Sequence, residues 1–108
     1  MTADNLRGLF SLAREHDVPI LLVVVPFRFQ LDDPEGSSGP QGKVGAIATE
    51  AEVVVLDLLP VLAARMRERG ETPNDYYLDA DHLTALGNEI VGRAIADRIV
   101  REGWASRH

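Results

Sequence analysis

The chain has 108 residues, a formal net charge of -6 and no cysteine. The acidic balance argues against a nucleic-acid partner, and the absence of cysteine excludes disulfides and thiolate metal ligands. Hydrophobic residues make up 45% and charged residues 26%, which is typical of a globular protein, and the length predicts a single domain at most.

The first half of the chain predicts a helix, a strand and a loop. Apolar residues recur at helical spacing over residues 5–16, and Val18-Pro19 ends this helix. The run from Ile20 to Val25 is typical of a strand buried on both faces in a parallel sheet. The apolar stretch that contains it is far shorter than the roughly 20 residues that span a bilayer, so no membrane segment is expected. Residues 30–42 lack periodicity and are rich in Asp, Pro, Gly and Ser, which predicts a mobile surface loop.

The second half of the chain predicts a second strand and three more helices. In order, the expected elements are a short helix over 44–51, a strand over 53–56, a helix over 58–69, a polar loop over 71–82 and a long helix to about Arg101. Gly70 is placed to end one helix, and Thr84 is placed to cap the next.

The alternation of helices and strands predicts an α/β fold with a parallel sheet and flanking helices. Only two strands are clear, whereas sheets of this class usually have five or more. We therefore expect part of a larger flavodoxin-like, three-layer sheet, with a complete small domain of unusual topology as the alternative. Open strand edges would favour self-association or pairing with another half of the domain.

Residues 77–88 carry the most informative pattern, because they place His82 in a loop just before a helix. A histidine that acts as a general base needs one ring nitrogen free for the nucleophile and the other held by a carboxylate. Asp79, three residues upstream on the same turn, can reach this second nitrogen. Asp81 is the competing candidate, but its side chain is expected to point elsewhere. Gly87 would let the helix pack closely against a neighbouring strand.

This segment resembles the block that closes the domain of SGNH (GDSL-type) hydrolases, which is Asp-x-x-His followed by Leu-Thr and Gly-Asn. The matching residues are Asp79, His82, Leu83, Thr84, Gly87 and Asn88. The resemblance extends back through three further segments and covers nearly the whole chain. These are the strand over 20–26, the turn Phe27-Arg28-Phe29-Gln30 and the stretch Val55-Leu56-Asp57-Leu58-Leu59-Pro60, which together resemble the last two strand units of such bacterial hydrolases.

The resemblance implies that residues 1–108 are the carboxy-terminal half of such a domain. It implies a serine ester hydrolase or acyl transferase that acts on an acyl ester through an acyl-enzyme. His82 would then be the base of the catalytic triad, and Asp79 its orienting carboxylate.

The chain departs from the family where the nucleophile should be. It contains no Gly-Asp-Ser motif and no Gly-x-Asn-Asp segment for the oxyanion hole, and Ser37 and Ser38 lie in a glycine-rich stretch typical of a flexible loop. We therefore expect this chain to be inactive alone. The alternatives are a non-catalytic α/β module or degenerate hydrolase domain that associates through its sheet edge, and an unrelated flavodoxin-like binding domain.

Three further residues are weaker site candidates. Arg28 follows the first strand, where open α/β sheets place ligands, so it either contacts substrate or is simply solvated. Tyr76 and Tyr77 either line an acyl pocket or cover the core.

No cofactor and no metal are expected. Asp79, Asp81 and His82 resemble a metal cluster, but three ligands within four residues are too local to form a closed site. Of the other histidines, His16 is expected at a solvated helix end, and the terminal His108 is expected to be disordered.

Overall fold

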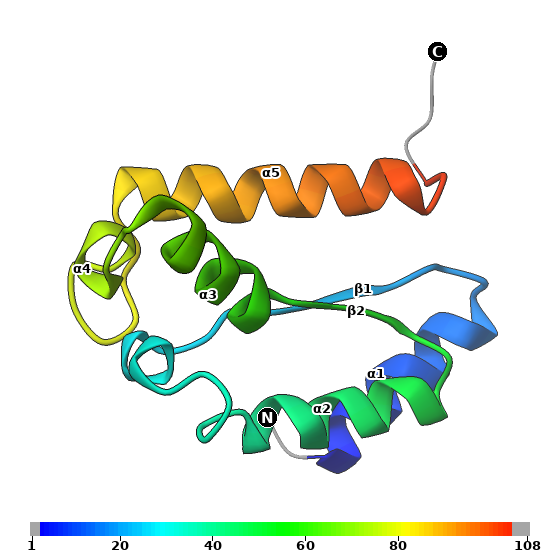
Figure 1. Cartoon of the computed structure of the whole chain (residues 1–108). Coiled ribbons are helices and arrows are strands. Elements are labelled where there is room, and N and C mark those ends of the chain that lie inside the picture. Colours follow the sequence, from blue (N-terminus) through cyan, green and yellow to red (C-terminus); the bar gives the residue numbers. More distant parts are fainter. Residues whose placement is uncertain (1–2, 105–108) are drawn as a thin grey trace.

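The computed structural model describes residues 3–104 of the chain. Within this range the chain forms a mixed α/β structure of five α-helices, one 3-10 helix and two β-strands (Figure 1). In chain order these are α1 (Ala3–Glu15), β1 (Leu21–Val24), η1 (Arg28–Asp32), α2 (Gly39–Glu50), β2 (Val54–Asp57), α3 (Leu58–Arg69), α4 (Pro73–Tyr76) and α5 (Ala85–Arg101). No helix in this range combines the length and apolar character needed to cross a bilayer. His108 lies outside the described residues.

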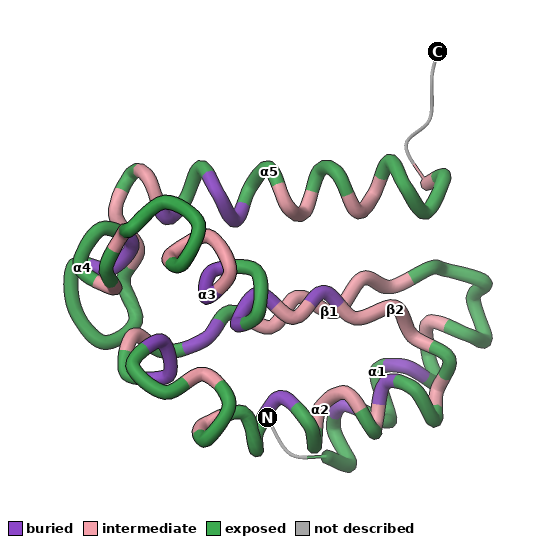
Figure 2. The backbone as a smooth tube through the Cα atoms, viewed as in Figure 1, coloured by how far each residue is buried: buried purple, intermediate pink, exposed green. Residues whose placement is uncertain are grey.

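The two strands form a parallel sheet whose register runs from Leu21 opposite Val54 to Val24 opposite Asp57. Helix α2 makes the crossover that parallel pairing requires. The predicted α/β class and parallel pairing are therefore confirmed. The prediction that both strands are buried on both faces is wrong, because Leu56 is the only buried residue among their eight (Figure 2). In a two-stranded sheet both strands are edge strands, so water reaches their side chains.

Helices cover both faces of this sheet, with α1 and α2 on one side and α3 and α5 on the other (Figure 1). Successive side chains of a strand point to opposite faces. Leu22 accordingly packs with Phe10 of α1 on the first face. Val23 and Leu56 pack with Val91 of α5 on the second face.

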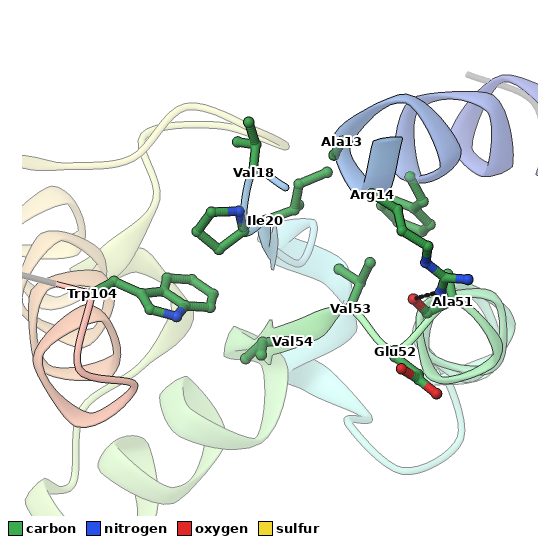
Figure 3. A pocket seen from close by; sticks show the side chains of 11 residues that line it. Ala13, Arg14, Val18, Ile20, Ala51, Glu52, Val53, Val54 and Trp104 are labelled. Carbon is green, nitrogen blue, oxygen red and sulfur yellow. Dashed lines mark hydrogen bonds between the residues drawn. The ribbon is translucent and has the colours of Figure 1, made fainter. Parts of the chain in front are cut away.

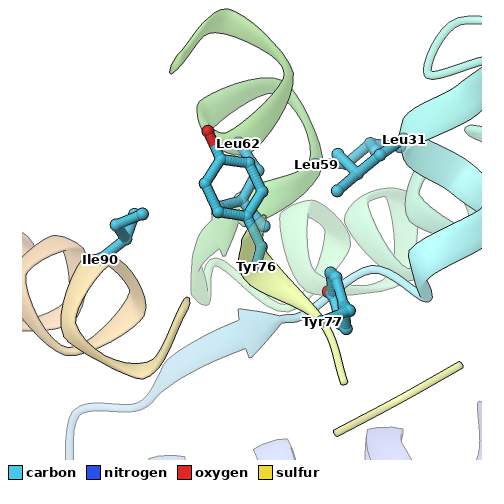
Figure 4. Packing of buried hydrophobic residues seen from close by; sticks show 6 residues of the cluster. All are labelled: Leu31, Leu59, Leu62, Tyr76, Tyr77 and Ile90. Carbon is cyan, nitrogen blue, oxygen red and sulfur yellow. The ribbon is translucent and has the colours of Figure 1, made fainter. Parts of the chain in front are cut away.

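A separate cluster of buried side chains joins η1, α3, α4 and α5 at the carboxyl end of the strands (Figure 4). Its members are Leu31, Leu59, Leu62, Tyr76, Tyr77 and Ile90. Both tyrosine rings therefore cover the core. The Tyr76 hydroxyl donates to the Glu71 carboxylate at 2.8 Å, and the Tyr77 hydroxyl donates to the Pro26 carbonyl. Burial, together with the bond to Glu71, raises the pKa of Tyr76 to about 12.

The predicted helix ends at Gly70 and Thr84 are confirmed, and the structure adds a cap at Asp57 that the sequence analysis did not predict. The Asp57 carboxylate accepts the backbone N–H of Leu59 at 3.1 Å and caps α3. Gly70 ends α3 with a φ of 66°, which is left-handed backbone that glycine adopts without strain. Thr84 caps α5, because its hydroxyl oxygen accepts the N–H of Gly87 at 3.0 Å.

The expectation of an irregular loop over residues 30–42 is wrong, because η1 and the first turn of α2 extend into it. Gln30 is only 3% exposed and organises the segment. Its side-chain oxygen accepts the N–H of Phe27 at 2.9 Å, and its amide nitrogen donates to the Ser37 carbonyl at 2.8 Å and to the Gln41 side chain at 3.0 Å. Hydrophobic periodicity does not reveal a turn that side-chain to backbone bonds hold together.

Gly87 makes the close approach that the sequence indicated, but the neighbour is not a strand. A Cβ atom at this position would lie 2.4 Å from the Tyr76 carbonyl oxygen at the end of α4. A backbone neighbour cannot rotate away as the end of a side chain can.

We predict that Gly87→Ala lowers the free energy of unfolding by about 1–3 kcal/mol, because the added methyl group forces α5 away from α4. Gly92→Ala is the matched control, since Gly92 lies in the same helix and its Cβ would meet nothing within 4 Å. This second substitution should stabilise the protein by about 0.5–1 kcal/mol through helix propensity. Urea denaturation of the two variants measures both effects, and equal stabilities would contradict the packing constraint.

Candidate functional site

The segment that carries Asp79 and His82 is a short loop closed at its base by backbone bonds. Tyr77 and Leu83 pair in an antiparallel bridge, and the N–H of Leu78 donates to the His82 carbonyl at 2.7 Å. The N–H of Thr84 donates to the Tyr76 carbonyl at 2.8 Å. The loop therefore begins and ends on the buried junction of α4 and α5.

Asp79 organises the interior of this loop. Its Oδ1 atom accepts the backbone N–H groups of Asp81 at 3.1 Å and His82 at 2.9 Å. Both of its carboxylate oxygens lie 2.9 Å from Nδ1 of the His82 ring. The structure thus brings the two predicted triad residues into direct contact, with Asp79 on Nδ1 and the opposite ring nitrogen, Nε2, turned away from this carboxylate.

The expectation that Asp81 points away from His82 is wrong. Its Oδ1 atom lies 3.1 Å from the same Nδ1 atom, because the tight turn that Asp79 closes brings the Asp81 side chain back beside the ring. Asp79 remains the residue that fixes the ring, since it also bonds the backbone of the loop. Asp81 adds a second negative charge beside the imidazole.

The electrostatics of the loop follow from these contacts. The backbone N–H groups of Asp81 and His82, together with the His82 ring, lower the pKa of Asp79 to about 2. The hydrogen bond that the Asp79 carboxylate accepts from the His82 ring, and then the charges of Asp79 and Asp81, raise the pKa of His82. The side chains of His82 and Asp79 are 73% and 58% exposed, so water screens their attraction. The arrangement can hold an imidazole in one orientation and stabilise its protonated form.

The same three side chains are the nearest approach to a metal site in the described residues. Their ligand atoms lie within 4.8 Å of one another. All three are exposed, and Asp79 Oδ1 already accepts two backbone N–H groups. We read the group as a hydrogen-bonded carboxylate and imidazole pair.

Arg28 lies beside this loop, but its side chain has another partner. Its backbone N–H donates to the Ala80 carbonyl at 2.9 Å, which ties the turn after β1 to the Asp79–His82 loop. Its guanidinium Nε donates to the side-chain oxygen of Asn74 in α4 at 3.0 Å. The contacts of Arg28 therefore hold two loops together, a role that the sequence did not indicate.

The two candidate serines bond within their own loop. The Ser37 hydroxyl donates to the Asp33 carbonyl at 2.6 Å, and the Ser38 hydroxyl donates to the Glu35 carbonyl at 3.0 Å. Both hydroxyls therefore bond backbone carbonyls of the loop that carries them.

A hollow of about 200 Å³ lies away from the Asp79–His82 loop, at the amino ends of the strands (Figure 3). Trp104, Pro19 and Val54 form part of its apolar wall. Arg14 borders it, with its guanidinium donating to the Ala51 carbonyl at 2.6 Å. The residues around it include none of the predicted site residues, so the candidate site is at the other end of the sheet.

Two polar residues that position the site were missed in the sequence. Gln30 stands three residues after Phe27, a spacing at which a side chain can return to the backbone at the start of a helical turn. This spacing is a sequence signal for the role of Gln30. No local pattern indicates the role of Asn74, because it bonds Arg28 across a separation of 46 residues.

No protein-family model, curated protein or solved structure matches the chain.

We predict that Asp79→Asn lowers the pKa of His82 towards its ordinary value of 6.5, because asparagine can still accept the loop N–H groups but carries no charge. Asp81→Asn should lower the pKa of His82 less.

In the folded protein the raised pKa of His82 stabilises the loop below pH 6.5, and the lowered pKa of Asp79 stabilises it above pH 3.8. Both contributions are complete between these values. The first is lost as pH rises through the folded pKa of His82, and the second as pH falls towards 2.

Nuclear magnetic resonance titration of the His82 ring protons measures the pKa of His82 in the parent and in both variants. A His82 pKa that is unchanged in Asp79→Asn would show that the contact is absent in solution.

Proposed function

We propose that this chain is the carboxy-terminal half of an SGNH (GDSL-type) hydrolase domain and supplies the base and the orienting carboxylate of its triad. The observation that supports this most is the Asp79–His82 contact, in which the carboxylate holds Nδ1 and leaves Nε2 for a nucleophile. The contact lies at the carboxyl end of β1, where open α/β sheets place their active sites.

The chemistry proposed for the complete domain is ester hydrolysis or acyl transfer through a serine supplied by the other half. His82 Nε2 takes the proton of the serine hydroxyl as its oxygen attacks the ester carbonyl. The resulting imidazolium then gives this proton to the departing alkoxide, which leaves an acyl-enzyme. Water or a sugar hydroxyl next attacks the acyl group and loses its proton to His82. The bond between the serine oxygen and the acyl group then breaks, the imidazolium returns the proton to that oxygen, and the acid or the new ester is released. Asp79 keeps the ring oriented and stabilises its charge in each step.

The fold proposed for the complete domain is a flavodoxin-like sandwich of three layers. The helices on both faces of the sheet are consistent with the outer layers of such a sandwich (Figure 1). Within residues 3–104, β1 pairs with β2 alone, so its other edge can accept a further strand. The amino-terminal half would continue the sheet at this edge and bring its serine to the carboxyl end.

We predict that the isolated chain does not hydrolyse p-nitrophenyl acetate above background, and that mixing or fusing it with an amino-terminal half that carries Gly-Asp-Ser produces esterase activity. In the active pair, His82→Ala should lower kcat/KM by about 10³-fold or more, because proton transfer to and from the serine is lost. Asp79→Ala should cost less, because the imidazole remains basic but is poorly held. Asp81→Ala should be close to the parent.

His16→Ala is the matched control for this experiment, since His16 is exposed and follows the end of α1. If Asp81→Ala costs as much as His82→Ala while Asp79→Ala is silent, the orienting carboxylate has been assigned to the wrong residue. Full activity in all three variants of the active pair would overturn the triad.

A second candidate function, a non-catalytic module that associates through its sheet edge, is favoured by a groove along β1. The groove has a volume of about 590 Å³ and is lined by residues 22–24 of β1, by Val25 just after it, by apolar side chains of α1 and α2, and by Lys43 of α2. Such an apolar strand edge is a site for strand addition from another chain.

We predict that the isolated chain forms dimers at high concentration and that Val25→Lys weakens them, because a lysine on the edge must keep its charge in water. Val25 is 43% exposed and lines the groove. Val100→Lys, at an exposed position on α5, is the control and should leave association unchanged. Sedimentation equilibrium measures both, and a parent chain that stays monomeric would exclude association through this edge.

A further inference from the structure

Three exposed apolar side chains belong to the Asp79–His82 loop and to the turn that is bonded to it. Leu78, the residue before Asp79, is 74% exposed, and Phe29 and Phe27 are 61% and 53% exposed. The two phenylalanine rings stack on each other, with centroids 5.9 Å apart and an angle of 12° between their planes. Leaving large apolar side chains in water gives up the stabilisation of their burial, so a group of them beside polar catalytic candidates calls for a partner.

The turn that carries the two rings is fixed to the loop that carries His82. Arg28, between the two phenylalanines, donates its N–H to the Ala80 carbonyl at 2.9 Å. The Tyr77 hydroxyl donates to the Pro26 carbonyl just before the turn. Two bonds therefore set the position of the turn relative to the loop.

The turn is also held from within. The buried Gln30 side chain accepts the N–H of Phe27 and is bound in turn by Gln41. The conformation of the Phe27–Phe29 turn is therefore fixed by the fold while its rings remain in water. A preformed apolar surface of this kind binds an apolar group at low cost in conformational entropy.

We propose that Phe27, Phe29 and Leu78, here called the apolar platform, bind the apolar acyl chain of the ester substrate and set a preference for medium-length acyl groups over acetyl. This inference rests on the proposed function, because it places the acyl chain next to His82. The platform offers contact area and no charged side chain, so acyl length is the property that it distinguishes. Each methylene that a ligand buries raises affinity by about fourfold, so methyl hexanoate should bind at least about tenfold more tightly than methyl acetate even if the platform covers only about two of its additional methylenes.

The test is a titration of the isotope-labelled full chain with methyl hexanoate, with methyl acetate as the short-chain control. We expect the ester to shift the resonances of Phe27, Phe29, Leu78 and His82 together. The double variant Phe27→Ser/Phe29→Ser and the single variant Leu78→Ser should each weaken binding. Val100→Ser is the matched control, because Val100 is 66% exposed on α5 and lies outside the platform.

The outcomes separate this inference from the proposed function, because binding to the isolated chain needs no nucleophile. Shifts that are absent, or that are spread equally over Val100 and other exposed apolar residues, would overturn the platform and leave the triad standing. Shifts at the platform without any esterase in the active pair would overturn the proposed function and, with it, the role of the platform in substrate choice. If the double variant loses its pairing with the amino-terminal half while it still binds the ester, the platform is an interface and the inference fails.

Discussion

Tyr76 and Tyr77 connect the Asp79–His82 loop to the rest of the molecule. Their rings are buried among side chains of η1, α3 and α5, and their backbones hold both ends of the loop through the Leu83 bridge and the bond to Thr84. The Tyr77 hydroxyl reaches the turn after β1. The position of the site therefore depends on a core that lies beneath it, and the loop itself contributes little to that core.

Local hydrogen bonds within the loop orient the Asp79 carboxylate and the His82 imidazole. Asp79 bonds the backbone and the ring with the same carboxylate, so its position does not depend on His82 alone. The pair nevertheless stands in water, where its electrostatic interactions are weak. A site of this kind becomes an effective proton relay only when another surface excludes water and supplies the nucleophile. This is the physical basis for the proposal that the chain supplies half of a catalytic site.

The sheet of β1 and β2, like the Asp79–His82 pair, is only partly shielded from water. Helices cover both faces, yet the strands stay half-buried, and the edge of β1 opens into an apolar groove. Parallel sheets occur mainly where both faces and most edges are covered. The open edge and the exposed Asp79–His82 pair lie on elements that meet at the carboxyl end of β1, so the amino-terminal half that we propose could cover both.

The sequence by itself determined the order of the main elements, the parallel α/β class, the helix ends at Gly70 and Thr84, and the pairing of Asp79 with His82. These depend on local rules, because helix periodicity, capping chemistry and a spacing of three residues act within one or two turns of chain. Only the tertiary structure decided that the tyrosines are core residues, that Gln30 is buried and bonded to Gln41, and that Arg28 bonds Asn74. These contacts join segments that periodicity treats as polar loops. Their energies come from burial and from hydrogen bonds between distant positions, which no local pattern encodes.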